Sequence, residues 1–455
     1  MGDKNLDQAP PPVPPTITAG GKRIWIYPDR RPGAIAKFRR NLALGLIVLY
    51  VAMPWIKVGG HPMLRIDVVD KVAYLFGGVF RMTDGGFLAF AFLLLGLILF
   101  LATALFGRVW CGYACPQTVF VEWVIRPIEE FIEGNAAHRK IVDSSPKTAK
   151  VWGKKIIKHV LYLGVAAFVA NTFLGYFFDP RVILHWMLQP PGDHPKPFFF
   201  MSFVMLAFYF DLTWFREQFC SFVCPYARFQ SILLDRDSPI IAYDVNRGEP
   251  RGRRAEGHCI DCGLCQRVCP TGIDIRDGLQ LECIMCGRCA DACDSVMTSL
   301  KRPLELIGRK STRELDGEKR KSWFRPRVFI YMGIISAVSA LFVYRLTHRP
   351  EVVMHLLRAP GAAYSTLPDG RLANLFNLHV MNNTNGDARL DLELISPPTA
   401  QLICGACGIT LKPLEDKTIS VVVAVTRDAV ENSNSPIIIR RAGTTEEVKN
   451  ILILP

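Results

Sequence analysis

Two closely spaced runs of cysteine constrain the possible fold of this chain more than any other feature. Each run has the spacing C-x2-C-x2-C-x3-C, and the members are Cys259, Cys262, Cys265 and Cys269, then Cys283, Cys286, Cys289 and Cys293. This spacing is the bacterial pattern for [4Fe–4S] ligation, in which the fourth cysteine of a run binds the cluster of the other run. The alternative is structural zinc, which usually takes two C-x2-C pairs. The segment therefore predicts a fold built around metal clusters.

The pattern assigns the cysteines to two [4Fe–4S] clusters. One cluster would take Cys259, Cys262, Cys265 and Cys293, and the other would take Cys283, Cys286, Cys289 and Cys269. Pro270 follows the first run, whereas Asp294 stands in the matching place after the second, which alters a local turn and leaves the ligands intact. The chain has 14 cysteines in 455 residues, too few for a disulfide scaffold. Their tight grouping indicates metal or redox chemistry in a reducing compartment.

Five apolar runs are candidate membrane spans: Leu42–Ile56, Gly86–Phe106, Val160–Phe178, Phe198–Phe215 and Val328–Tyr344. A spanning helix needs about 20 apolar residues. The second run meets this requirement best, whereas the first is short and contains Pro54, so a buried core helix is the alternative there. The sequence predicts an α-helical multi-pass membrane protein with about five transmembrane helices.

Lysine and arginine counts alternate between these runs. Residues 1–40 contain eight, loop 58–86 three, loop 107–156 eight, loop 179–197 two and segment 216–327 twenty. Because cytoplasmic loops carry the excess of positive charge, the alternation fixes an orientation. We expect a flexible cytoplasmic tail (1–40), a four-helix membrane domain (41–215), a cytoplasmic ferredoxin-like domain (216–327), a fifth helix (328–345) and an exported domain (350–455). The net charge of +13 then needs no nucleic-acid partner.

The exported domain is predicted to be all-β. Short apolar or alternating runs occur at Asn374–Met381, Leu390–Leu394, Thr418–Val425, Pro436–Arg440 and Val448–Leu454. Turn-rich pieces separate these runs, which is typical of a small β-sandwich. The domain also contains Cys404 and Cys407, which could form a local disulfide, handle copper or only pack.

The second and fourth apolar runs both end in the pattern C-x-x-x-C-P. Cys111 and Cys115 follow the second run, and Cys220 and Cys224 follow the fourth, 109 residues later. The offset predicts two related two-helix units. Residues i and i+4 of a helix share a face, so each pair could present two thiolates, which favour Cu(I), zinc or an iron–sulfur cluster. The alternative is that these cysteines only fill space in a core.

Four segments carry a resemblance to a known family: Gly107–Thr118 (GRVWCGYACPQT), Cys224–Gln230 (CPYARFQ), Tyr243–Gly252 (YDVNRGEPRG) and Cys269–Gln280 (CPTGIDIRDGLQ). With them the chain resembles the cytochrome c oxidase accessory proteins of the FixG/RdxA/CcoG type. The likeness runs from about residue 24 to residue 300, and a last span with an exported Ig-like sandwich also fits.

The resemblance implies an inner-membrane iron–sulfur protein, with cytoplasmic clusters and a periplasmic β domain, that helps to mature the cbb3-type cytochrome oxidase. It also implies an oxidoreductase activity, the reduction of Cu(II) to Cu(I). The candidate copper or electron-relay residues are then Cys111, Cys115, Cys220 and Cys224. Expected partners are oxidase assembly factors or a copper chaperone or transporter, and a homodimer is left open.

Two other functions stay open. A quinol-oxidising electron relay, like the NapH/NosR membrane ferredoxins, would share the C-x-x-x-C-P motifs and the clusters. A non-catalytic scaffold would instead bind oxidase subunits through its exported β domain.

Isolated polar residues give weaker signals. Two His–Met pairs in the loops expected outside could offer copper ligands, although such residues often have no such role: His61 with Met63, and His185 with Met187. Asp211 lies inside an apolar run, which is costly unless it is paired. We expect it to pair with Arg216, and a proton or quinone role is the alternative.

Overall fold

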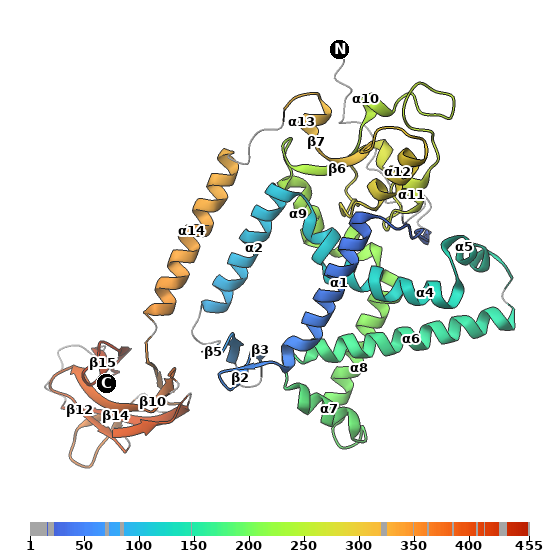
Figure 1. The fold of residues 1–455 in the computed structure, drawn as a ribbon. Coiled ribbons are helices and arrows are strands. Elements are labelled where there is room, and N and C mark those ends of the chain that lie inside the picture. The colour runs from blue at the N-terminus through green and yellow to red at the C-terminus, as the bar shows by residue number, and fades with distance from the viewer. Residues whose placement is uncertain are drawn as a thin grey trace. The chain divides into compact units, whose positions relative to one another are not determined.

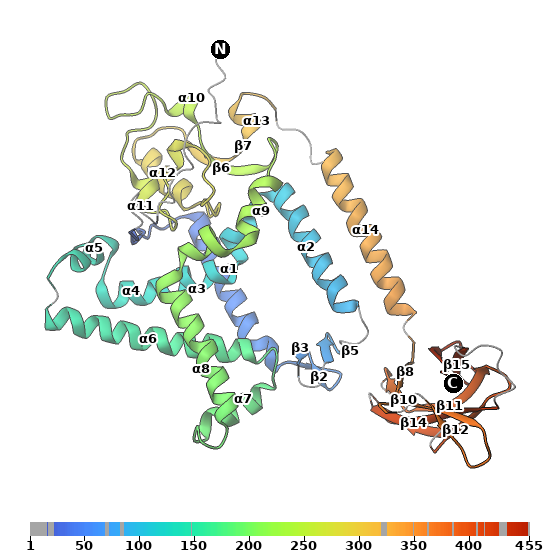
Figure 2. The ribbon, with the colours of Figure 1, turned by 180° about the vertical axis from the view of Figure 1, so that it is seen from behind.

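The computed structural model describes residues 16, 22–68, 72–81, 86–146, 148–319, 325–348, 350–361, 364–384, 386–405, 408–413, 415–426 and 435–453. The chain forms two compact units, one of residues 1–78 and 88–339 and one of residues 79–87 and 340–455. Figures 1 and 2 show the elements of each from opposite sides.

Helices dominate the chain up to the fourth candidate span. In chain order the elements are α1 (Ala34–Ala52), η1 (Met53–Trp55), β1 (Lys57–Val58), β2 (His61–Pro62), β3 (Leu64–Asp67), β4 (Val72–Leu75), β5 (Gly78–Arg81), α2 (Phe87–Phe106), η2 (Trp110–Ala114), α3 (Pro116–Phe120), η3 (Val121–Ile125), α4 (Arg126–Glu133), α5 (Ala136–Ser144), α6 (Ala149–Leu174), α7 (Pro180–Leu188), α8 (Pro195–Phe210) and η4 (Asp211–Phe215). Strands β1 and β2 pair antiparallel, as do β3 and β4.

Four helices in the described part of the chain are long and apolar enough to cross a membrane: Ala89–Phe106, Ala149–Leu174, Pro195–Phe215 and Pro326–Thr347. They correspond to the second to fifth predicted spans. The first predicted span lies in α1 and η1. Helix α1 is 19 residues long, but it carries three basic residues, Lys37, Arg39 and Arg40, and is not one of the four helices. Part of α1 instead packs in a core with α6 and η4, where Ile47 and Tyr50 meet Tyr162 and Leu212.

The cysteine-rich segment follows η4 and is mostly irregular backbone held by short elements. These are η5 (Phe219–Val223), α9 (Pro225–Leu233), β6 (Pro239–Tyr243), α10 (Val245–Gly248), α11 (Leu264–Arg267), η6 (Ile275–Asp277), α12 (Arg288–Ser299), β7 (Ile307–Ser311) and α13 (Thr312–Leu315), before α14 (Pro326–Thr347). Strands β6 and β7 pair antiparallel, and both views show α11 and α12 beside them. Their buried side chains form one core with the cysteines.

Residues 22–33 differ from the predicted flexible tail, because they pack on the cysteine-rich segment. The amide of Asp29 donates to the carbonyl of Arg267 at 2.8 Å. The carboxylate of Asp291 accepts hydrogen bonds from the amides of Ile35 and Ala36, and so caps the N-terminus of α1 from a distant part of the sequence. Gly33 at the cap position has no side chain for this task, so the cap could not be found locally.

The second unit contains a β-sandwich. One sheet has the order β12-β14-β10-β8 with β9 beside β10, and the other has the order β13-β11-β15-β16. The strands are β8 (Val352–Arg358), β9 (Ser365–Thr366), β10 (Leu372–Asn382), β11 (Ala388–Ser396), β12 (Gln401–Cys404), β13 (Gly408–Leu411), β14 (Asp416–Val425), β15 (Pro436–Arg441) and β16 (Glu447–Ile451). Alternate residues of both sheets, such as Phe376, Val421 and Leu390, point into a shared core and are fully buried. All five predicted strands are present.

Candidate functional site

The eight cysteines of the two runs line two cavities in the cysteine-rich segment. Cys259, Cys262, Cys265 and Cys293 line one cavity, together with apolar side chains from α12, β6 and β7. Cys269, Cys283, Cys286 and Cys289 line the other, which Cys265 also borders. The structure thus groups the cysteines as the spacing predicts, with the fourth member of each run crossing to the other cavity. Because each quartet combines three neighbouring thiols with one distant thiol, both sets suit a [4Fe–4S] cluster.

The backbone around each cavity repeats the same unusual conformation. Asp261 and Gly263 flank Cys262 with φ of 55° and 64°, and Met285 and Gly287 flank Cys286 with φ of 52° and 74°. Non-glycine residues rarely adopt such angles. Backbones of this kind turn successive N–H groups toward one point, as in many iron–sulfur sites. The two glycines also form the N-terminal caps of α11 and α12.

Burial dominates the electrostatics of these thiols. It raises the pKa of Cys265 to about 11, although Arg276 opposes it, and the pKa of Cys283 and of Cys293 to about 12. The pKa of Cys289 rises well above its usual value for the same reason. Metal ligands must be thiolates, so loading these sites is coupled to proton release.

The two C-x-x-x-C-P motifs adopt matching local structures. Cys111 lies in the π-helical turn η2 and Cys220 in the π-helical turn η5. The amide of Cys115 donates to the carbonyl of Trp110 at 2.8 Å, and the amide of Cys224 donates to the carbonyl of Phe219 at 2.9 Å. Each second cysteine is thus the cap of a π turn, so the predicted α-helical face is replaced by a wider turn.

The flanking residues match as well. Pro116 and Pro225 each begin the next helix, where proline needs no hydrogen-bond donor. Gly107 and Arg216, four residues before the first cysteine of each motif, both have positive φ, 73° and 44°. Because the same features recur at the 109-residue offset, the motifs have repeated local structures.

Cys220 lines a small cavity with Gln117 and Thr118, which follow Cys115, and with Ile284, which also packs on Cys111. Burial raises the pKa of Cys220, and the neighbouring charges of Cys115, Cys111 and Cys224 raise it further. Burial also raises the pKa of Cys115, with a contribution from Cys224. Within the residues that the structure describes, no three His, Cys, Asp or Glu side chains converge closely enough to hold a single metal ion.

The first repeat motif packs directly on a cysteine loop of the second cavity. Cys111 forms a buried apolar cluster with Ile284 and Cys286. A Cβ atom at Gly112 would lie 2.6 Å from the carbonyl oxygen of Ile284 and 3.1 Å from the Cα of Cys286, so only glycine leaves room for this approach. The guanidinium of Arg108 donates to the carbonyl of Cys283 at 3.3 Å. The repeat motif and the cluster site are therefore in van der Waals contact.

Buried charges hold these parts together, and the sequence reading missed them. Glu122 pairs with Arg288 at 2.6 Å and with Arg126, which also pairs with Glu217. Arg126 further donates to the carbonyl of Pro270 at 2.9 Å. The network thus joins η3 and α4, the segment before Cys220, and both cysteine runs. Apart from Glu122 and Arg126, which are four residues apart, the partners are distant in sequence, so no local pattern predicts the network.

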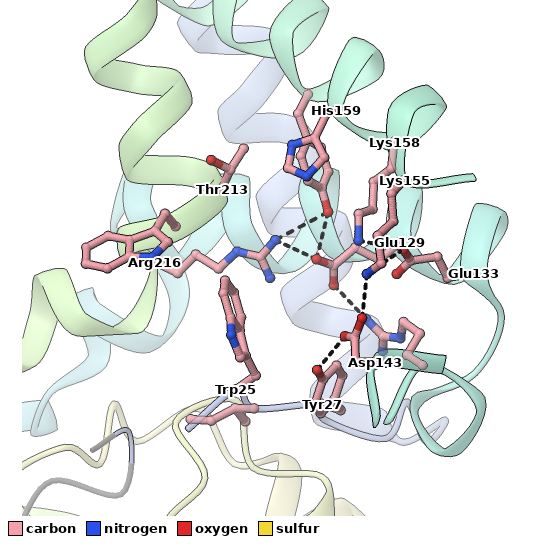
Figure 3. Close-up of a pocket in the computed structure, with 14 residues that line it drawn as sticks. Trp25, Tyr27, Glu129, Glu133, Asp143, Lys155, Lys158, His159, Thr213 and Arg216 are labelled. Carbon is pink, nitrogen blue, oxygen red and sulfur yellow. Dashed lines mark hydrogen bonds and ion pairs between the residues drawn. The ribbon is translucent and has the colours of Figure 1, made fainter. Parts of the chain in front are cut away.

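The prediction that Asp211 pairs with Arg216 is wrong. Its carboxylate accepts from the amide of Gln117 at 3.2 Å, whereas Arg216 pairs with Glu129 at 2.5 Å. Figure 3 shows Arg216 reaching Glu129 in a cavity that charged and aromatic side chains line. Burial alone would raise the pKa of Glu129, but Arg216, Tyr162 and Arg139 outweigh it and lower the pKa to about 2.

The remaining candidates make other contacts. His61 stacks on Tyr74, and His185 is 2.9 Å from Gln189. Met63 follows β2, and Met187 lies in α7. Cys404 is disulfide-bonded, and Cys407 lies outside the described residues.

Family models match three parts of the chain. A 4Fe-4S dicluster domain matches residues 215–256 and 249–312, and a 4Fe-4S binding domain matches residues 88–136, which contain Cys111 and Cys115. A domain described as an IG-like fold at the C-terminal of FixG matches residues 342–452. The β-sandwich is therefore Ig-like, and the cysteine-rich segment is an iron–sulfur domain.

Several curated proteins are similar along most of the chain. Protein RdxA of Cereibacter sphaeroides is 34% identical over 390 residues, and the match covers 82% of each chain. Nitrogen fixation protein FixG of Rhizobium meliloti is 29% identical over 84% of this chain and 81% of its own. RdxB of Cereibacter sphaeroides is 31% identical over 82% of each chain. A crystal structure of a FixG-related protein from Vibrio parahaemolyticus matches 23% of this chain and 96% of its own at 19% identity, with a TM-score of only 0.20.

Proposed function

Since this chain belongs to the FixG/RdxA family of membrane iron–sulfur proteins, we propose that it is a redox enzyme that reduces Cu(II) to Cu(I) at the four repeat cysteines. The observation that carries the proposal is the contact between the motif of Cys111 and the loop of Cys286. This contact joins the proposed cluster site, which would carry single electrons, to the repeat cysteines, which are soft metal ligands.

The cysteine-rich segment would hold two [4Fe–4S] clusters. Cys259, Cys262, Cys265 and Cys293 would bind one, and Cys269, Cys283, Cys286 and Cys289 the other. Bound clusters would supply one-electron transfer. The apolar side chains around both cavities shield most of the thiolates from water, whereas Cys262 is exposed. The Arg276 guanidinium beside Cys265 offsets part of their negative charge.

The repeat cysteines would receive the copper substrate. Each Cu(II) ion takes up one electron and becomes Cu(I), which thiolates bind better. Cys111 contacts the cluster site through Ile284 and Cys286, and Cys220 lines a small cavity that Ile284 and Thr271 also line. An electron therefore has a packed protein path from Cys286 to the copper ligands.

The test is anaerobic reduction of Cu(II) by dithionite-reduced, desalted protein, with Cu(I) trapped by a chromophoric chelator. The Cys111→Ser, Cys220→Ser double variant should lose most of the rate. Ser221→Ala is the matched control, because it lies in the same π turn as Cys220 and is partly buried. Equal rates in the double variant and the control would refute copper chemistry at the motifs.

The cellular role that we propose is assembly of the cbb3-type cytochrome oxidase in the bacterial inner membrane. The clusters would be cytoplasmic and the Ig-like domain periplasmic, as the charge alternation indicates. The partners would be oxidase assembly factors or a copper chaperone or transporter. Loss of the chain should then lower copper in the oxidase while leaving its haem content intact, which metal analysis of the purified oxidase measures.

A further inference from the structure

The cavity that contains Glu129 and Arg216 takes no part in the cluster sites or the copper site. It has a volume of about 380 Å³ and is open enough to admit a small molecule. Its walls come from residues 25–27, from α4 and α5, from the first half of α6 and from the end of η4 (Figure 3). Ligand cavities in proteins start at about 300 Å³.

The cavity lies where two membrane-capable helices change from apolar to charged. In α6, Lys155 and Lys158 line it, and the helix then continues as an apolar run from Val160. Trp214 lines it from the end of the span that begins at Pro195. Tryptophan and lysine at such a boundary are typical of the membrane–water interface. An amphipathic molecule dissolved in the membrane could therefore reach this cavity.

The aromatic lining suits a flat ring. Trp25, Tyr27, Tyr162 and Trp214 contribute rings to the walls. Trp214 is 46% exposed and stacks at 5.0 Å on Phe210, which is 52% exposed, so these two rings form an apolar edge beside the cavity. An aromatic ligand with an apolar tail could stack inside and leave its tail along this edge.

Each lysine and arginine side chain that lines the cavity already has a carboxylate partner in the protein, although four cations share three carboxylates. Arg139 and Arg216 pair with Glu129, Lys158 pairs with Glu133, and Lys155 pairs with Asp143. Tyr27 also donates to Asp143 at 2.5 Å. Because these cations are paired, the cavity suits a neutral ligand with hydroxyl groups better than a strongly anionic one. The exposed imidazole of His159 can accept a proton.

The cavity is also joined to the redox site by two residues. Arg216 lines it and also lines the small cavity that contains Cys220 and Thr271. Ile26 lines it and packs on Gly272, where a Cβ would lie 2.9 Å from the Ile26 side chain. Gly272 is three residues after Cys269, a predicted cluster ligand. Electrons released in the cavity would have a short packed path to the cluster site.

We propose that this cavity binds a membrane quinol, which donates the electrons used by the clusters. The inference rests on the proposed redox function, because it names the electron donor for it. One quinol loses two electrons and two protons and becomes a quinone. Two oxidised [4Fe–4S] clusters would each accept one electron, and the two protons would pass by way of His159 to water.

The test uses the full chain with its clusters, in nanodiscs and under anaerobic conditions. Menadiol is added, and cluster reduction is followed by absorbance and electron paramagnetic resonance, with no copper present. We expect wild-type clusters to be reduced and Trp214→Leu to slow this reduction roughly tenfold through lost stacking. Trp152→Leu is the matched control, because Trp152 is 53% exposed on the same helix as His159 and does not line the cavity. His159→Gln should change the pH profile of the reduction.

Three results would overturn the quinol proposal. In the first, dithionite reduces the clusters but menadiol does not. In the second, Trp214→Leu and Trp152→Leu change the rate of cluster reduction by menadiol equally. In the third, mass spectrometry finds an anionic phospholipid tightly bound to the wild type and to Trp152→Leu but absent from Trp214→Leu. None of these three results would contradict the proposed copper reduction, because that step is tested separately with dithionite-reduced protein.

Discussion

Replacing Gly112 by alanine tests the contact between the repeat motif and the cluster loop. The added methyl would lie 2.6 Å from the carbonyl oxygen of Ile284 and 3.1 Å from the Cα of Cys286. Ordinary contacts of this kind are about 3.4 Å or longer, so one backbone must retreat by roughly 0.8 Å. Overpacking of this size costs about 1–3 kcal/mol of stability. Both neighbours are backbone atoms, so no side chain can rotate away to relieve the clash.

The expected phenotype is a slower electron transfer to copper with unchanged clusters. Gly112→Ala should keep its iron content and its reduction by dithionite, because it removes no predicted ligand. Its rate of Cu(I) formation should fall, since Cys111 moves away from Cys286. Gly96→Ala is the matched control, because a Cβ there meets nothing within 4 Å. A wild-type rate in Gly112→Ala, with the clash confirmed by a lower unfolding temperature than Gly96→Ala, would refute the contact as the electron path.

Two further predictions follow from the site. Anaerobically purified protein should contain about eight iron atoms per chain, measured by a colorimetric assay; about twelve would mean that the repeat cysteines hold a further cluster, and zinc in place of iron would contradict the assignment. Glu129→Gln should destabilise the first unit by about 3–5 kcal/mol in chemical unfolding, because it leaves the buried Arg216 charge without its partner. The folded-state pKa of Glu129 is about 2 against an ordinary 4.5, so its stabilisation is present above pH 4.5 and is lost as the pH falls toward 2. A variant whose stability matches wild type at pH 7 would contradict this role.

Local sequence patterns predicted those features of the structure that depend on residues close together in the chain. The spacing of Cys259 to Cys293 encodes two interleaved quartets, and the structure groups the cysteines in that way. Runs of apolar residues mark α2, α6, α8 and α14, and alternation marks β10 and β14. The repeated C-x-x-x-C-P motif indicates related units, and the structure adds the matching π turns.

The rest depends on contacts between distant segments. Glu122 meets Arg288, and Asp291 caps α1, across about 160 and 250 residues of sequence. Asp211 lies five residues before Arg216, yet Arg216 pairs with Glu129 because α4 brings a carboxylate to it. Short strands such as β12 and β13 have too few residues to show a clear alternation. Only tertiary packing determines these features.

The most direct measurement follows the clusters themselves when copper arrives. Dithionite-reduced, desalted protein is mixed with Cu(II) in an anaerobic stopped-flow instrument, and cluster absorbance and chelated Cu(I) are recorded together. The wild type should reoxidise its clusters with one Cu(I) formed per electron lost. The variant with Cys111, Cys115, Cys220 and Cys224 all replaced by alanine, and with full iron content, should keep its clusters reduced. Equal reoxidation in both proteins would show that the clusters reduce copper without the repeat cysteines, and would contradict the proposed site.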